Sequence, residues 1–258
     1  MLADLTSGAV EDARAREAEL PLPALERKAL AASPAIDVLA ALAPSGTVRI
    51  IAEVKRASPS RGDLADIPDP ALQARLYEQG GASAISVLTE GRRFKGSLAD
   101  LEAVRAAVSV PVLRKDFIAT AYQVFEARAA GADLVLLIAA ALDQPTLATL
   151  HELVIELGMT PFVETHNLDE VRRASEIGAR LVGVNARDLS TFELDRDLFG
   201  RLAEHIPADA IKIAESAVLR PEDVAHYRND GADVVLVGEA LVTGDPVATL
   251  RDFLAVPA

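Results

Sequence analysis

Short apolar runs alternate with amphipathic stretches along most of the chain. Eight runs rich in Val, Ile, Leu and Ala occupy residues 48–54, 84–88, 110–114, 134–138, 161–164, 181–185, 211–215 and 234–237. Apolar residues recur at helical spacing in the segments that follow them, at residues 70–79, 98–107, 120–130, 144–157, 168–177, 196–204, 221–230 and 246–254. Runs of this length between helical segments are typical of buried parallel strands. The pattern therefore predicts eight strand–helix units.

Gly-Ala pairs mark the ends of four of the predicted helices. They begin at Gly81, Gly131, Gly178 and Gly231, each just before an even-numbered run. Glycine fits the left-handed position that follows a helix, so each pair indicates a helix stop. The pairs recur once every two units, and alternate strands of an eight-stranded barrel fill different layers of its core.

Two further helices are predicted before the first strand, at residues 2–19 and 22–43. They make residues 1–47 a helical extension of a single domain that covers residues 1–258. Eight strand–helix units in a chain of this length predict an α/β fold, a (β/α)8 TIM barrel with this N-terminal extension. The alternative is an open doubly wound sheet, but no G-x-G-x-x-G motif follows any predicted strand.

Composition narrows the class of protein. No apolar run is long enough to span a membrane, and the acidic start of the chain does not resemble a signal peptide, so a cytoplasmic protein without membrane contact is expected. The chain has no cysteine, which excludes disulfides and thiolate catalysis. The net charge of −13 disfavours nucleic acid as a partner. An anionic ligand would need a few well-placed basic residues.

Six of the predicted strands end in polar side chains, where a barrel carries its active site. These ends are Glu53 and Lys55, Arg114 to Asp116, Glu164 and His166, Asn185 and Arg187, Glu215 and Ser216, and Gly238 and Glu239. Mixed acids and bases indicate acid–base chemistry. Glu53, Glu164 and Glu215 are candidate bases. Lys55 and Lys115 are candidate acids, anion ligands or Schiff-base lysines.

Three points stay open at this level. Strand alternation puts Lys115 with Leu113 and Arg114 with Val112, without saying which pair faces the barrel interior. Backbone N–H groups after the seventh and eighth strands, with the hydroxyls of Ser58 and Ser60, could hold a phosphate. His166 is the one histidine near a strand end, so no metal site is expected.

The chain resembles a known family, the indole-3-glycerol phosphate synthases of tryptophan biosynthesis. The resemblance rests on ordered blocks along the predicted strands. These are IAEVKRASPSRG at 51–62, SVLTE at 86–90 with FKGS at 94–97, LRKDF at 113–117, VE at 163–164, GVNARDL at 183–189, IAES at 213–216 and VGEAL at 237–241. It implies a lyase that closes the indole ring of 1-(2-carboxyphenylamino)-1-deoxyribulose 5-phosphate with loss of carbon dioxide and water.

The resemblance also implies roles for the catalytic residues. Lys115 is similar to the general acid of ring closure, and Glu164 to the general base of the dehydration, with Lys55 as its partner acid. Glu53 and Asn185 are expected to orient these groups and the sugar hydroxyls.

Substrate contacts are implied as well. Ser58, Ser216, Gly238 and Glu239 match the phosphate region, Arg187 an anionic contact, and Glu215 a further acidic site residue. Phe94, Phe117, Leu136 and Phe192 match an apolar slot for the anthranilate ring. No cofactor and no metal are implied. The chain departs from the family at Ala217, where glycine is usual, and alanine would be strained if that position needs a positive φ.

Two alternatives remain at this level. One is a neighbouring phosphate-binding barrel such as phosphoribosylanthranilate isomerase, which is expected to use a Cys–Asp pair that this chain lacks. The other is a barrel that binds a phosphosugar or a partner without catalysis. The sequence does not predict the oligomeric state.

Overall fold

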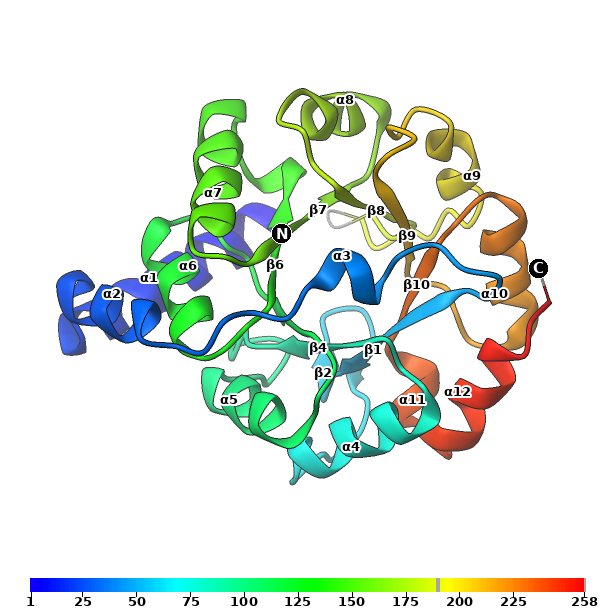
Figure 1. The fold of residues 1–258 in the computed structure, drawn as a ribbon, viewed down its shortest axis with the longest axis horizontal. Coiled ribbons are helices and arrows are strands. Elements are labelled where there is room, and N and C mark those ends of the chain that lie inside the picture. Colours follow the sequence, from blue (N-terminus) through cyan, green and yellow to red (C-terminus); the bar gives the residue numbers. More distant parts are fainter. Residues whose placement is uncertain (189–190, 258) are drawn as a thin grey trace.

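A computed structural model describes residues 1–188 and 191–257 of the chain, so Leu189 of the GVNARDL block and Ala258 lie outside the described residues. Eight parallel strands form a closed barrel in the order β1-β10-β9-β8-β7-β6-β5-β4 (Figure 1). The strands are β1 (Arg49–Val54), β4 (Ala84–Leu88), β5 (Val112–Lys115), β6 (Leu134–Ile138), β7 (Thr160–Thr165), β8 (Leu181–Asn185), β9 (Ile211–Glu215) and β10 (Val234–Val237). The predicted TIM barrel is confirmed, and the open-sheet alternative is wrong.

A ring of helices surrounds the barrel, one after each strand (Figure 1). They are α4 (Pro70–Gly80), α5 (Leu98–Ala107), α6 (Ala121–Ala129), α7 (Gln144–Glu156), α8 (Leu168–Glu176), α9 (Leu198–Ala203), α10 (Pro221–Asn229) and α12 (Pro246–Leu254). The predicted helix stops are also confirmed, because Gly81, Gly131, Gly178 and Gly231 all have φ between 71° and 99°. Only glycine adopts this backbone conformation without steric cost.

The N-terminal extension differs from its prediction. The expected helix at 22–43 is two helices, α2 (Leu22–Leu30) and α3 (Val38–Ala41), with an extended segment between them. Pro34 explains the break, because it lacks an N–H and disfavours helical geometry at the residue before it. The other predicted helix is α1 (Leu2–Glu19), as expected.

Three short elements were not predicted. The turn after β1 contains a small hairpin of β2 (Ala57–Ser58) and β3 (Gly62–Asp63). A 3-10 turn, η1 (Ala139–Ala141), follows β6, and α11 (Glu239–Val242) follows β10. All three lie at the carboxyl ends of strands, where they shape the mouth of the barrel.

Two apolar layers hold the fold together. Ile51, Leu113 and Ile213 belong to the layer inside the barrel, whereas their neighbours Ile50 and Val112 belong to the layer between strands and helices. Strand alternation therefore turns the even-numbered side chains of these strands outward and the odd-numbered ones inward. This places Glu53, Lys115 and Glu215 inside the barrel, above its apolar filling.

Candidate active site

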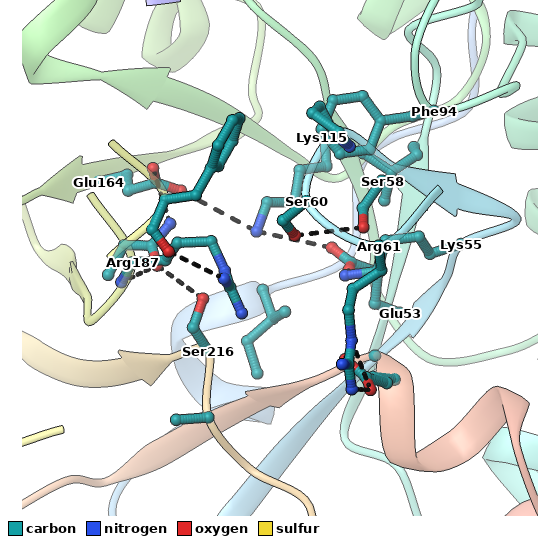
Figure 2. Close-up of a pocket in the computed structure, with 18 of the residues that line it drawn as sticks. Glu53, Lys55, Ser58, Ser60, Arg61, Phe94, Lys115, Glu164, Arg187 and Ser216 are labelled. Atoms are coloured by element: carbon teal, nitrogen blue, oxygen red, sulfur yellow. Dashed lines mark hydrogen bonds and ion pairs between the residues drawn. The ribbon is translucent and has the colours of Figure 1, made fainter. Parts of the chain in front are cut away.

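A cavity of about 670 Å³ opens at the carboxyl ends of the strands. Figure 2 shows Glu53, Lys115 and Glu164, from three separate strands, and Ser216, just after β9, projecting toward it. Every site residue predicted from the sequence lines this cavity except Glu215. Glu215 is only 1 % exposed and lies beneath Lys115. The structure thus brings the whole predicted set to one place.

Lys115 is the centre of the charged groups. It is the last residue of β5, and its Nζ lies 2.8 Å from Glu215 Oε2, 3.5 Å from Glu53 Oε2 and 3.9 Å from Glu164 Oε2. Burial alone would lower the pKa of this ammonium, but the three carboxylates outweigh it and raise the pKa well above the usual range. Lys115 therefore keeps its proton at neutral pH.

Arg114, next to Lys115, faces the other way. It is fully buried behind the barrel wall, where it donates to Asp116 Oδ2 at 3.0 Å and to Glu126 Oε2 at 3.3 Å. The question that strand alternation left open is thus resolved. Lys115 faces the pocket, and Arg114 joins β5 to α6.

Glu53 and Lys55 form an ion pair on β1 and the residues just after it. Their Oε1 and Nζ atoms are 2.8 Å apart. Burial would raise the pKa of Glu53, yet the ammonium groups of Lys55 and Lys115 together lower it. Glu53 is therefore a buried, ionised bridge between the two lysines.

Glu164 has two polar neighbours near the end of β7. Asn185 Nδ2 donates to its Oε1 at 3.2 Å, and His166 Nε2 lies 3.3 Å from the same oxygen. Burial opposes ionisation here, but His166 and Lys115 lower the pKa of Glu164 to about 2. For Glu215, burial and the nearby Glu164 carboxylate raise the pKa to about 8. Lys115 opposes the rise at Glu215, and of the two acids only Glu164 has a pKa below its usual value, so Glu164 is the better candidate for an ionised base.

Hydrogen bonds extend from Asn185 to the far side of the pocket. Asn185 Oδ1 accepts from Ser216 Oγ at 2.7 Å and from the backbone N–H of Arg187 at 3.0 Å. Ser216 and Ala217 both have left-handed backbone angles, with φ of 71° and 59°. The position that the family usually fills with glycine therefore does have a positive φ.

The opposite wall is apolar. The ring centroids of Phe94 and Phe117 lie 6.1 Å apart, tilted by 43°, and Leu136 is nearby in the same lining. The carboxylate of Glu90 holds the loop of Phe94 in place by accepting from the backbone N–H groups of Arg92, Arg93 and Phe94. A flat aromatic group would find a slot here beside the charged cluster.

The comparisons identify the family. The family model of indole-3-glycerol phosphate synthase matches residues 2–253. The chain belongs to the indole-3-glycerol phosphate synthase family. It is 72 % identical over 256 residues to the indole-3-glycerol phosphate synthase of Leifsonia xyli subsp. xyli, covering 99 % of this chain and 98 % of that protein. It is 56 % identical to indole-3-glycerol phosphate synthase 1 of Streptomyces coelicolor, covering 99 % and 95 % of the two proteins.

Solved structures show the same fold at low sequence identity. The 3-hexulose-6-phosphate synthase of Salmonella typhimurium matches with a TM-score of 0.67 and 18 % identity, covering 81 % of this chain and 98 % of that one. This likeness concerns the barrel alone. The family expected from the sequence is confirmed by the family model and the two relatives.

Several pocket residues of this indole-3-glycerol phosphate synthase family member were not predicted as site residues. They include Arg61, Ile138, Leu194 and Arg196. Arg61 forms an ion pair with Glu239, and Arg196 with Asp223 at 2.9 Å. Ile138 ends β6, where an apolar side chain gives no contrast with the rest of the strand. The other three residues lie in loops, where no strand or helix period indicates direction, so only the basic character of Arg61 and Arg196 was a signal.

Neither a membrane-spanning helix nor a cluster of metal ligands is present among the described residues. No helix of residues 1–188 and 191–257 is long and apolar enough to cross a membrane. Among the same residues, no group of three or more His, Cys, Asp or Glu side chains is arranged to hold a metal ion.

Proposed function

We propose that this pocket catalyses the reaction after which its family is named. It converts 1-(2-carboxyphenylamino)-1-deoxyribulose 5-phosphate to indole-3-glycerol phosphate, with release of carbon dioxide and water. The observation that carries the proposal is the family match across residues 2–253. The geometry supports it, because the cavity joins an acid–base cluster, an apolar slot and a set of loop cations.

Lys115 is the proposed general acid of ring closure. As the anthranilate ring attacks the ribulose C2 carbonyl, negative charge develops on the carbonyl oxygen. The Lys115 ammonium stabilises that charge and supplies the proton. Its carboxylate neighbours, led by Glu215 at 2.8 Å, keep the ammonium charged and hold it in place.

The apolar wall is the proposed site of the anthranilate ring. Phe94, Phe117 and Leu136 would cover the ring faces, and a carboxylate carried into this slot loses hydrating water. The carbon dioxide that leaves is neutral, so an apolar environment favours it over the charged carboxylate. Ring closure and decarboxylation then occur between the slot and Lys115. Phe192, in the segment between β8 and α9, also lines the cavity and would complete the slot.

Dehydration needs a base and an acid, for which we propose Glu164 and Lys55. Glu164 is ionised and can take the proton from the ring-closed intermediate. Lys55 donates to the departing hydroxyl, which leaves as water. Glu53 holds Lys55 at 2.8 Å, and Asn185 holds Glu164 at 3.2 Å, so both partners are oriented before the substrate arrives.

The phosphate is proposed to bind between Ser58 and the loops that follow β9 and β10. Ser216 and Gly238 would offer a hydroxyl and backbone N–H groups there, and Arg187 a charge. The Glu239 carboxylate would repel a phosphate, but it is paired with Arg61. We therefore expect Glu239 to contribute through its backbone N–H.

The test is an assay of the purified protein with the anthranilate-linked ribulose phosphate, followed by indole fluorescence. Formation of indole-3-glycerol phosphate is expected. Well-folded protein that yields no indole product would contradict the proposal.

A Lys115→Ala variant tests, in the same assay, whether Lys115 is the general acid of ring closure. We expect kcat to fall by roughly 10²–10⁴, as for loss of a general acid. Lys212→Ala is the matched control, because Lys212 also lies on a barrel strand, β9, but alternates away from the barrel interior. Equal rates for Lys115→Ala and the unchanged protein would remove Lys115 from its proposed role.

A further inference from the structure

His166 lies between two buried carboxylates just beyond β7. Its Nε2 is 3.3 Å from Glu164 Oε1, and its Nδ1 is 3.1 Å from Glu170 Oε2. Its side chain is 11 % exposed, and those of Glu164 and Glu170 are 2 % and 9 % exposed. The three residues form a carboxylate–imidazole–carboxylate series that leads from α8 to the pocket.

Glu170 fixes the orientation of the imidazole. Its Oε2 also accepts from the backbone N–H of His166 at 2.7 Å, and its Oε1 accepts from Asn167 Nδ2 at 2.6 Å. The Glu170 carboxylate is therefore held at both oxygens, and the ring it contacts cannot turn freely. The other ring nitrogen, Nε2, is buried without a hydrogen-bond partner among the described residues, and it is directed at Glu164.

The charged groups around this series come from several strands. Three charged groups surround Glu164, namely Lys115 on β5, Glu215 on β9 and His166. Glu53, on β1, contacts Lys115 in turn. Burial would lower the pKa of His166, but Glu164 and Glu170 raise it to about 10. The imidazole is therefore cationic at neutral pH.

We propose that His166 is a positioning residue for Glu164, holding this carboxylate ionised and turned toward the substrate, while Glu170 in turn orients the imidazole. His166 itself is absent from the pocket lining, so it acts through Glu164 and not on the substrate. The proposal rests on the proposed function, because it concerns the base of that same reaction.

The experiment measures kcat and KM against pH for His166→Asn and Glu170→Gln. Without the neighbouring cation, the pKa of Glu164 rises, and its protonation at acidic pH removes the base. The acid limb of the kcat profile should move to higher pH in both variants, and further in His166→Asn. At neutral pH kcat should fall roughly 10-fold or more, a part of the 10²–10⁴ of general-base catalysis, with KM nearly unchanged.

His151→Asn is a matched control. His151 lies on α7, is 5 % exposed, and also has a buried Nε2 without a hydrogen-bond partner among the described residues. No carboxylate contributes to its pKa, which burial lowers. Loss of a buried imidazole there should leave the acid limb and kcat as they are. The double variant His166→Asn/Glu170→Gln should be no slower than His166→Asn, because Glu170 acts through the ring.

An acid limb that stays in place in His166→Asn, with kcat unchanged, would overturn the proposal. A second measurement is independent of the substrate. The imidazole signals of His166 should titrate well above neutral pH in the unchanged protein and at lower pH in Glu170→Gln. A neutral His166 at pH 7 would overturn the proposal too, whereas missing indole product from the unchanged protein would count against the proposed function instead.

Discussion

Ala217 has a backbone conformation that favours glycine. Its φ is 59°, and Ser216 before it has a φ of 71°, so two consecutive non-glycine residues are left-handed. Such a conformation costs roughly 1–2 kcal/mol for a residue with a Cβ atom. Strand β9 ends here, beside the proposed phosphate region. The backbone strain is therefore located where the chain must turn to present its N–H groups.

Replacing Ala217 with glycine should stabilise the protein. Relief of the left-handed strain outweighs the greater entropy that glycine gives the unfolded chain, so we expect the free energy of unfolding to rise by about 1 kcal/mol. Urea denaturation of the variant and of the unchanged protein measures this difference in the free energy of unfolding.

Ala31→Gly is the control with the opposite sign. Ala31 is exposed and its φ is −85°, so glycine there only adds unfolded-state entropy and should lower stability. Equal changes at both positions would contradict the strain argument.

Individual site residues could be predicted where strand ends display them. Glu53, Lys115 and Glu164 break apolar runs, and this contrast is visible in the sequence. The inward direction of Lys115 was not predictable, because alternation is symmetric until one side chain is known to face the core. The contact of His166 with Glu170 depends on how α8 begins, which follows from packing and not from the spacing of residues.

At the scale of elements, α3 closes the amino end of the barrel. Val38 and Leu42 pack with the apolar layer inside the barrel, and Figure 1 shows α3 across its middle. Asp133, just before β6, secures the segment that leads to α3. Its Oδ1 accepts from the backbone N–H of Ile36 at 2.7 Å, and its Oδ2 accepts from that of Val112 at 2.8 Å and from Arg105.

Asp133→Ala should therefore destabilise the fold without slowing catalysis. The substitution leaves two backbone donors and the Arg105 guanidinium without their acceptor, at a cost of about 3 kcal/mol. Thermal unfolding should show a lower Tm, while kcat at 20 °C stays unchanged because the site lies at the other end of the strands.

The exposed Asp209 provides the comparison for this prediction. It precedes β9 at the same end of the barrel, and its side chain is 74 % exposed beside Arg180. Asp209→Ala should change stability by less than about 0.5 kcal/mol. A similar loss at both positions would mean that the buried hydrogen bonds of Asp133 contribute little.

Helices and strands could be predicted where apolar residues recur at regular spacing along the chain. The strand and helix order followed from repeated apolar runs and from glycine stops. The helix at 22–43 was predicted wrongly because its apolar spacing continues through Pro34, which the structure leaves extended. The β2–β3 hairpin has only two residues in each strand, too short for a period of two to be recognised.

The whole molecule is acidic outside and holds mixed charges within its pocket. Its net charge of −13 would repel an anionic substrate, so attraction depends on local cations. Lys55 and Arg187 line the cavity near its mouth, while Lys115 already faces three carboxylates. We infer that the carboxylates inside the barrel, although costly to bury, are retained for the site, because Lys115 alone would be an unpaired buried charge.

These buried groups make the stability of the whole molecule depend on pH in two directions. Glu164 has a folded pKa of about 2, below its usual value of 4.5, so its contribution is present above pH 4.5 and is lost as the pH falls toward 2. His166 has a folded pKa of about 10 against the usual 6.5, so its contribution is complete below pH 6.5 and is lost as the pH rises to 10. The raised pKa of Glu215, about 8, adds to the alkaline loss from pH 4.5 upward.

Stability should therefore be greatest in mildly acidic buffer and should fall on both sides. Each group contributes a slope of at most about 1.4 kcal/mol per pH unit. Urea denaturation from pH 3 to pH 10 measures the profile. In His166→Asn the decline between pH 6.5 and 10 should become shallower, because the contribution of the imidazole is gone. The decline below pH 4.5 should shrink but not vanish, because the pKa of Glu164 rises without His166 while Lys115 still lowers it. An alkaline slope identical in the two proteins would show that the imidazole is not charged in the folded state.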